Sequence, residues 1–338
     1  MPFRYLIVTI CLFVNVGCSP PSPKIFAIYG NTMGTSYTVK FVHPNNVDFD
    51  KTVLKKKIDE TLVKVNMLMS TYDPHSEISQ FNQSPAKIPF QISEQTELVL
   101  NEAIRLAHLT NGILDITAGP YINLWGFGPD KVPNRIPSAS ELSTIKEYVG
   151  IDKLELLSGY LTKSNENVYV DLSSIAKGYG VDVVANIVEE SGIKAYLVEI
   201  GGEMKVKGEK SRENGWVTAI EKPITNERAI QRYLTIGDNS VATSGDYRNY
   251  FESNGKRYSH LINPKTGAPI THNLVSVTVI HSSSMTADGL ATALNVMGPE
   301  KAKTLAESEG LSILMITKEN GEFVEYMSPM FTKTITVY

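Results

Sequence analysis

Strand-like segments that follow one another through tight turns restrict the folds open to this chain more than any other feature of its sequence. Residues 26–42 contain two such runs, with Gly30 and Gly34 near the bends, and they predict a hairpin. Similar runs and turns occupy most of the chain after residue 194. Strands joined by hairpins form antiparallel sheets, whereas parallel sheets need crossover connections. The sequence therefore predicts an α+β fold of antiparallel strands and several packed helices, without a doubly wound sheet.

Capping residues and apolar stripes locate the helices. Asp50 precedes an amphipathic stretch, and Ser138 with Glu141 forms a capping box for a short helix. Further helices are predicted from Ser93 to Asn111, from about Ser173 to Glu190, over 285–294 and after Pro299. Strands are predicted over 153–162, 167–171, 195–208, 215–223, on both sides of a turn at Asn254-Gly255, and over 274–281, 311–316 and 322–328, with loops over 70–82 and 117–130.

The N-terminal residues resemble a bacterial export signal. A basic residue precedes an apolar run over 5–14 that is too short to span a membrane. Residues 16–18 resemble the end of a lipoprotein cleavage box, although Asn15 stands where that box usually has Leu or Val. We predict a lipoprotein signal peptide over 1–17; the alternative is a plain signal peptide cut near Gly17.

Cysteine usage favours the lipoprotein. The two cysteines are Cys11 in the leader and Cys18 at the proposed cut, so the remaining chain cannot form an internal disulfide. Cys18 is then predicted to carry the lipid, with residues 18–24 as the acylated tether and 25–338 as a single catalytic domain. The predicted location is the periplasmic side of a bacterial membrane, to which the exported protein is anchored by its lipid.

Charge and motif content exclude several classes of function. The formal net charge is −4 and no dense run of Lys or Arg occurs, so no nucleic-acid partner is expected. The chain lacks a Walker-type phosphate loop and a His-Glu-x-x-His zinc motif, and its Gly-x-Gly pairs lack the third glycine of a dinucleotide fingerprint. A nucleotide site in this chain must therefore follow another design.

The stretch DLSSIAKGYGVD, residues 171–182, joins a predicted strand to a predicted helix. Asp171 ends the strand, and Ser173 or Ser174 opens the helix. Lys177 follows within the first turns, where free backbone amides and a cation suit a phosphate group. The alternative is a capped helix with a solvent-facing lysine, which this motif alone favours.

The stretch MTADGLATAL, residues 285–294, places two oxygen-bearing side chains on an apolar helix. Asp288 and Thr292 are four residues apart, so they share one face of the helix. A carboxylate and a hydroxyl are ligands that Mg²⁺ accepts. Alternatively, Asp288 offsets the helix dipole from the first turn and Thr292 bonds back to a carbonyl. The sequence does not separate these two interpretations.

One histidine and several aromatic residues lie in loops that suit a site. His260 lies between a hairpin and a tight turn, which makes it the candidate general base among the six histidines, although a histidine there is often structural. Tyr72, Trp125 and Phe127 offer rings that can stack on a flat ligand, or that fill structural space beside glycines.

Three short motifs point to a different enzyme class. Residues 174–177 fit Ser-x-x-Lys, residues 247–249 fit Tyr-x-Asn and residues 265–267 fit Lys-Thr-Gly, the signatures of penicillin-binding serine acyl enzymes. In those enzymes Lys-Thr-Gly lies on a strand beside the nucleophile, whereas prolines and glycine here predict a turn. We reject this interpretation.

Taken together, the motifs of the chain resemble the ApbE family, the FAD:protein FMN transferases. The resemblance runs from about Thr32 to Phe331, with Asn263 where Asp is usual and Gly289 where Ala is usual. It is carried by NTMGTSY, MSTYDPHSEISQFN, LDITAGPYINLWGFGP, DLSSIAKGYGVD, YLVEIGGE, ATSGDYRNYF, YSHLINPKTGAP and TADGLATAL.

The resemblance implies an α+β catalytic domain that binds FAD and Mg²⁺ and moves FMN from FAD to a Ser or Thr hydroxyl of an acceptor protein, releasing AMP. The residues it implies for FAD are Met33, Tyr72, Ile113, Leu114, Asp115, Asp171, Lys177 and Ile262. For Mg²⁺ it implies Ser174 through its carbonyl, Asp288 and Thr292, and His260 is the implied proton acceptor.

The resemblance also implies partners and leaves alternatives open. The family's usual acceptors are flavin-bearing subunits of sodium-pumping NADH:quinone reductases and of Rnf complexes. The same site could instead hydrolyse FAD to FMN and AMP, as a pyrophosphatase, or the chain could be a passive flavin-binding lipoprotein.

Overall fold

The computed structural model describes most of the chain after the leader, namely residues 24–43, 49–129, 135–211, 214–224, 229–247, 249–253 and 255–338. The predicted signal peptide over 1–17 and the lipidation site at Cys18 lie outside the described residues. These two features, and the division into leader, tether and catalytic domain, stay predictions. None of the helices in the described ranges combines the length and the apolar character that a membrane crossing requires.

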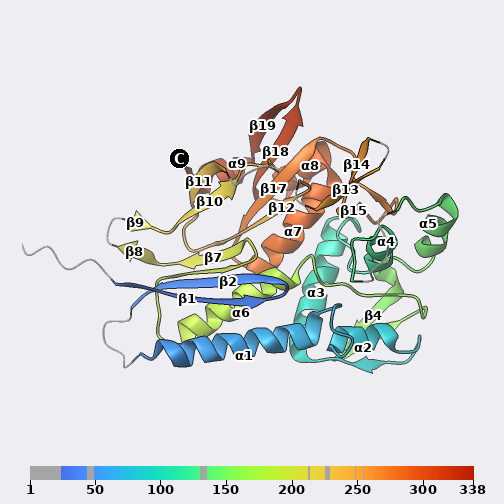
Figure 1. The fold of residues 1–338 in the computed structure, drawn as a ribbon, viewed down its shortest axis with the longest axis horizontal. Coiled ribbons are helices and arrows are strands. Elements are labelled where there is room, and N and C mark those ends of the chain that lie inside the picture. Colours follow the sequence, from blue (N-terminus) through green and yellow to red (C-terminus); the bar gives the residue numbers. More distant parts are fainter. Residues whose placement is uncertain are drawn as a thin grey trace, which may run out of the picture.

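An eight-stranded sheet organises the molecule, and every neighbouring pair of its strands is antiparallel. This arrangement confirms the predicted α+β class (Figure 1). Across the sheet the strands are β1 (Ile25–Thr32), β2 (Thr35–Val42), β6 (Tyr196–Ile200), β7 (Glu203–Lys207), β12 (Ser240–Gly245), β17 (Leu274–His281), β18 (Ser312–Glu319) and β19 (Glu322–Met327).

Both faces of this sheet are covered, as the alternation of buried residues along β18 shows. Ile313 and Met315 belong to one core and Leu314 and Ile316 to another, because successive side chains point to opposite faces. The first core is shared with the helices α3 (Glu94–Leu109) and α7 (Ser284–Met297). The second is shared with β10 (Val217–Glu221), β11 (Ile230–Thr235) and α9 (Pro329–Thr334).

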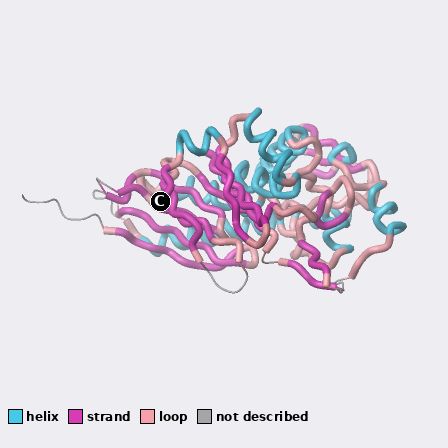
Figure 2. Tube along the Cα trace, turned by 90° about the horizontal axis from the view of Figure 1, so that it is seen from above, coloured by secondary structure: helices cyan, strands magenta, loops and turns pink. Residues whose placement is uncertain are grey.

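A third core lies between β1, β2 and β6 and the helices α1 (Lys51–Met69) and α6 (Ala176–Glu190). The strands gather toward one end of the molecule, and most of the loops and short helices lie toward the other (Figure 2). The remaining elements are α2 (Glu77–Gln83), β3 (Phe90–Gln91), α4 (Gly119–Leu124), α5 (Ala139–Lys146), η1 (Ile151–Lys153), β4 (Leu154–Leu157), β5 (Tyr160–Lys163), β8 (Glu209–Ser211), β9 (Asn214–Gly215), β13 (Tyr250–Ser253), β14 (Lys256–Ser259), β15 (Ile262–Asn263), β16 (Ala268–Pro269), α8 (Pro299–Ser308) and β20 (Thr336–Val337).

Most of the predicted elements are confirmed, and the helix caps are among the most accurate. The Asp50 side chain accepts from the amide of Thr52 at the start of α1, and Ser138 and Glu141 form the predicted capping box of α5. The hairpin over 26–42 is present, but its turn is at Met33-Gly34, where both residues have a positive φ. Gly30 instead lies within β1, where the ring of Tyr37 occupies the place of a side chain.

Four local predictions are wrong. The loops predicted over 70–82 and 117–130 contain the short helices α2 and α4. Residues 167–171 form no strand, and the helix predicted from Ser173 begins at Ala176. The extended segment keeps its place because the Asn82 side chain pairs with both backbone groups of Val170, at 2.7 and 2.9 Å, as a neighbouring strand would.

Helices α6 and α7 approach each other closely at Gly178. A Cβ atom there would lie 2.3 Å from the carbonyl oxygen of Ser284 and 2.8 Å from the Cβ atom of Asp288. Only glycine permits this separation. The crossing holds the start of α6 against the side chain of Asp288.

We expect Gly178→Ala to separate the two helices and to lower the free energy of unfolding by about 1–3 kcal/mol, the usual cost of overpacking. This loss outweighs the helix propensity of alanine, worth about 1 kcal/mol, because a backbone carbonyl cannot move aside. Urea unfolding would measure the difference. Gly215→Ala is the control, since the nearest atom there is 3.5 Å away at Thr235. Equal stability of the two variants would contradict the close crossing.

Candidate functional site

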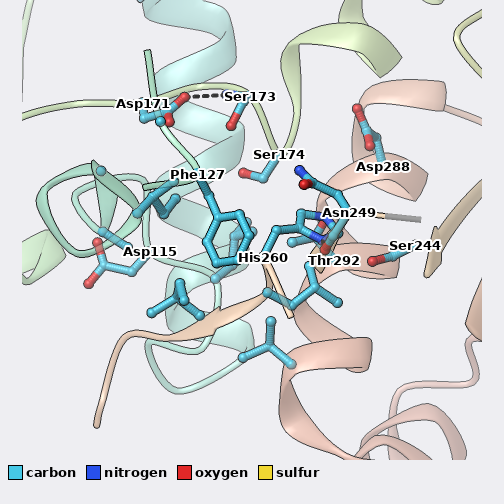
Figure 3. A pocket seen from close by; sticks show the side chains of 18 of the residues that line it. Asp115, Phe127, Asp171, Ser173, Ser174, Ser244, Asn249, His260, Asp288 and Thr292 are labelled. Carbon is cyan, nitrogen blue, oxygen red and sulfur yellow. Dashed lines mark hydrogen bonds between the residues drawn. The ribbon is translucent and has the colours of Figure 1, made fainter. Parts of the chain in front are cut away.

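A pocket of about 420 Å³ gathers nearly all of the predicted site residues (Figure 3). It lies where the start of α6, the face of α7, the end of β12 and the loops around α4 and β15 meet. The predicted residues that line it are Tyr72, Ile113, Leu114, Asp115, Asp171, Ser174, Lys177, His260, Ile262, Asp288 and Thr292.

Met33 is the predicted flavin-binding residue that the pocket lining does not include. Its side chain packs against Gly180 on α6, one turn beyond Lys177, and adjoins two of the cores. The turn that carries it lies close by, because the Thr35 side chain lies near Gly201, which does line the pocket.

Lys177 lies between two buried carboxylates. Its Nζ atom is 3.0 Å from Oε1 of Glu203 and 3.4 Å from Oδ1 of Asp288. Burial alone would lower the pKa of Lys177, but the two carboxylates outweigh it and hold that pKa above its ordinary value. The lysine is therefore cationic at neutral pH and supplies a fixed positive charge to the pocket.

Asp288 is held by the start of the neighbouring helix. Its Oδ2 atom accepts a hydrogen bond from the amide of Gly178 at 2.9 Å, and the residue is 4% exposed. Burial raises the pKa of Asp288, while Lys177 and the Gly178 amide oppose the increase. The helix α7 begins at Ser284, so Asp288 lies beyond the first turn, and offset of the helix dipole does not account for it.

Two further carboxylates line the pocket opposite α7. Asp115 is half-buried and accepts from the Thr117 amide at 2.8 Å and from the Thr117 hydroxyl at 2.6 Å. Asp171 accepts from the amide of Ser173 at 2.9 Å, as Figure 3 shows. Burial raises the pKa of both carboxyls. This bond closes a turn between Asp171 and Ser173, and α6 begins after it, at Ala176.

The hydrogen bond of His260 to the backbone fixes which of its two ring nitrogens carries the proton. Nδ1 lies 2.9 Å from the carbonyl oxygen of Asn249, and a carbonyl can only accept, so Nδ1 carries the proton. Burial lowers the pKa of His260, and the positive charges of Arg257 and Lys177 add to this effect. The ring is therefore neutral at neutral pH, with Nε2 free to accept a proton. This is the tautomer that a general base requires.

The donor set suits Mg²⁺ better than a softer metal. Asp288 and Thr292 lie on one face of α7 and Ser174 lies across from them at the start of α6, all lining the same pocket (Figure 3). No group of three or more His, Cys, Asp or Glu side chains within the described ranges could hold a metal. Mg²⁺ needs only one or two protein carboxylates, since it keeps waters and binds phosphate oxygens. One buried carboxylate with hydroxyl and carbonyl oxygens therefore fits this ion.

The aromatic residues divide into structural and pocket-lining groups. Trp125 is buried, stacks on Tyr258 with ring centroids 5.6 Å apart and donates to the carbonyl of Gly267 at 2.8 Å, so it fills structural space. Phe127 lines the pocket, with its ring centroid 6.3 Å from that of His260. Tyr72 is 72% exposed and lies at the rim.

Some pocket residues were not predicted from the sequence. Glu203 is buried, contacts Lys177, and has a pKa raised to about 7, chiefly by burial. Asn249 fixes His260 through its backbone, which no side-chain pattern reports. Thr243 and Ser244, at the end of β12, also line the pocket. The available signal for Glu203 was its place directly after the tight turn at Gly201-Gly202.

The geometry also disagrees with a serine acyl enzyme. Residues 265–267 lie in the turn between β15 and β16, where the Gly267 amide donates to the carbonyl of Asn263 at 2.8 Å. Lys177, which would have to activate Ser174, is paired with Glu203 and Asp288. The rejection made from the sequence agrees with this arrangement.

Known proteins resemble the chain over nearly its full length. The profile of the ApbE family matches residues 33–315. A Vibrio cholerae protein named FAD:protein FMN transferase is 47% identical over 328 residues, which cover 97% of this chain and 98% of the relative. An Escherichia coli protein of the same name is 40% identical and covers 94% of this chain and 93% of its own length.

Solved structures agree with the sequence relatives. The flavin transferase ApbE from Vibrio cholerae superposes with a TM-score of 0.86 at 45% identity, covering 92% of this chain and 99% of that one. The apo form of the flavinyl transferase ApbE from Pseudomonas stutzeri has a TM-score of 0.85 at 37% identity, covering 92% and 97%.

Proposed function

The chain belongs to the ApbE family, and from this premise we propose that its pocket transfers the FMN part of FAD to a Ser or Thr hydroxyl of an acceptor protein, with AMP as the second product. Flavin transfer from FAD to a protein is the activity named for its relatives, and it is the activity of this enzyme. The observation that carries the detailed proposal is the convergence of Lys177, Asp288 and a neutral His260 on one pocket.

The reaction exchanges one phosphorus–oxygen bond for another. The acceptor hydroxyl oxygen bonds to the phosphorus of the FMN half, the pyrophosphate bond breaks, and its electron pair leaves with AMP. His260 takes the hydroxyl proton at Nε2, because Nδ1 is already protonated and bonded to Asn249. Lys177 places positive charge beside the pyrophosphate, and the first amides of α6 extend that field.

Asp288, Thr292 and the backbone of Ser174 would hold Mg²⁺. When bound, the ion supplies positive charge to the phosphate oxygens as electrons move toward the leaving group. The protein's own part is to fix the carboxylate, which the Gly178 amide and Lys177 do from α6. Asp115 and Asp171, on the opposite wall, offer acceptor oxygens for the hydroxyl and amino groups of FAD.

The setting of the reaction follows from the N-terminal sequence. A lipid on Cys18 would anchor the enzyme to a membrane on the periplasmic side, with a short tether before β1. The acceptors that the family resemblance implies, flavin-bearing subunits of redox-driven ion pumps and of Rnf-type complexes, would be reached at that surface. The target is accordingly a protein hydroxyl accessible from the same side of the membrane.

The test uses the purified mature chain, FAD, Mg²⁺ and a flavin-free acceptor subunit. We expect fluorescence on the denatured acceptor band and a mass increase of one FMN, with both lost when EDTA removes the metal. A dark acceptor with AMP accumulating would favour FAD hydrolysis. A dark acceptor with FAD unchanged would favour a passive flavin-binding lipoprotein.

A further inference from the structure

The main sheet divides next to the pocket. β12 pairs with β17 over its whole length, from Ser240 to Gly245. Its pairing with β7 on the other side covers only Ser240 and Val241. Beyond Val241, in the described part of the chain, no strand is paired to this edge of β12. Four residues of an internal strand therefore present an open edge.

The backbone groups that this edge presents can be assigned from the register. The carbonyl of Asn239 accepts from the amide of Val206 on β7 at 2.9 Å, so Asn239 faces β7. In an antiparallel ladder, every second residue directs both its N–H and C=O groups to the same neighbour. The backbone groups of Thr243 and Gly245 therefore point toward the β7 side of the sheet. Among the described residues they have no partner strand there, because β7 begins at Glu203, after the turn at Gly201-Gly202, and does not extend as far along β12.

A groove of about 440 Å³ lies along this edge. Its other walls are β10, through Ala219 and Ile220, and the start of β2. The groove shares Gly201, Thr243 and Gly245 with the flavin pocket, so the two spaces adjoin at these residues. Ser244, Asn249 and His260 line the pocket and not the groove.

We propose that the acceptor protein enters through this groove as an extended segment that adds to the open edge of β12 as a strand. The proposal rests on the proposed function, because it assigns a place to the acceptor of the same reaction. An extended segment satisfies the ladder groups of Thr243 and Gly245, and its alternate side chains face the groove walls. A Ser or Thr at the pocket end of the segment then reaches His260 and the pyrophosphate.

Strand addition at the open edge of β12 would bring a hydroxyl of the acceptor protein to the pocket in a fixed position. Main-chain hydrogen bonds fix the position of the segment with little regard to its sequence, so the target hydroxyl is placed by register. The flavin occupies the pocket from the α4 and α7 side, and the acceptor arrives from the β10 side. The two substrates meet at the end of β12.

Filling the groove tests the proposal. Ala219 is exposed and lines the groove but not the flavin pocket, and Val217 lies two residues before it on the same face of β10, outside the groove. We expect Ala219→Trp to raise the KM for the acceptor by about ten-fold or more, with the Kd for FAD unchanged. The matched Val217→Trp should behave as the natural protein does.

Two results would contradict binding of the acceptor in this groove. An unchanged KM for the acceptor in Ala219→Trp would show that the acceptor does not bind there. Weaker binding of FAD by the same variant would assign the groove to the flavin. A natural enzyme that transfers no FMN would contradict the proposed function instead, so the two failures are distinguishable.

Backbone methylation tests the strand addition itself. Short peptides around the target hydroxyl of a sodium-pump acceptor subunit would each carry one N-methyl amide. We expect every second position to lose transfer by about three- to ten-fold, the effect of one lost hydrogen bond, and the positions between to change little. Losses without this alternation would overturn strand addition.

Discussion

Replacing Asp288 by Asn is expected to lower flavin transfer at least 10²–10³-fold, roughly the effect of removing one group that stabilises transition-state charge. Asn keeps the size of the side chain and an oxygen for the Gly178 amide, which Asp288 accepts at 2.9 Å. It removes the negative charge that pairs with Lys177 and that the proposed Mg²⁺ site requires. Asp288→Ala should abolish transfer while the fold remains, because Glu203 still pairs with Lys177. Single-turnover transfer with a fluorescent acceptor would measure both variants.

The control for this charge is Glu60→Gln on α1, where the side chain is 66% exposed and does not line the pocket. It should transfer at the natural rate. Circular dichroism and the Kd for FAD should be retained in Asp288→Asn, since Asp115, Asp171 and Tyr72 line the pocket from other elements. Natural transfer by Asp288→Asn or Asp288→Ala at saturating Mg²⁺ would remove the metal site from the mechanism.

The parts of the site that lie on one element could be predicted from the sequence. Asp288 and Thr292 share a helical face, and the helical period alone places them together. The start of α6 was less predictable. Two serines offered caps, but neither side chain caps α6, whose N-cap residue is Ile175. The Asp171 side chain instead closes a turn with the Ser173 amide before the helix begins.

The parts that depend on strand order could not be predicted in this way. Glu203 reaches Lys177 because α6 packs against β7, and the sequence pattern does not report which helix packs on which strand. The same holds for the open edge of β12, which exists because β7 turns away at Gly201-Gly202. Neither periodicity nor capping reports which strands become neighbours. Gly178 is similar, since only the crossing of α6 and α7 shows why a side chain is excluded.

Replacing His260 by Ala is expected to lower transfer about 10²–10⁴-fold, the range for loss of a general base, while the Kd for FAD changes little. The pH profile identifies the role. Because burial and nearby cations lower the pKa of His260 below its ordinary value of about 6.5, the base is neutral at neutral pH. Transfer by the natural enzyme should therefore be level near neutrality and fall as the pH drops through that lowered pKa. In His260→Ala this acid limb should be absent.

Two controls separate the histidine from its surroundings. His108 is exposed on α3, and His108→Ala should keep both the rate and the acid limb. Glu203 has a pKa raised to about 7 and also titrates near neutral pH, so the profile is repeated in Glu203→Gln, where an acid limb that persists belongs to His260. If His260→Ala loses FAD binding together with transfer, the ring is a ligand contact or a structural group rather than the base. If it keeps the acid limb at a reduced rate, another group takes the proton, and the hydrogen bond to Asn249 serves only to hold the loop.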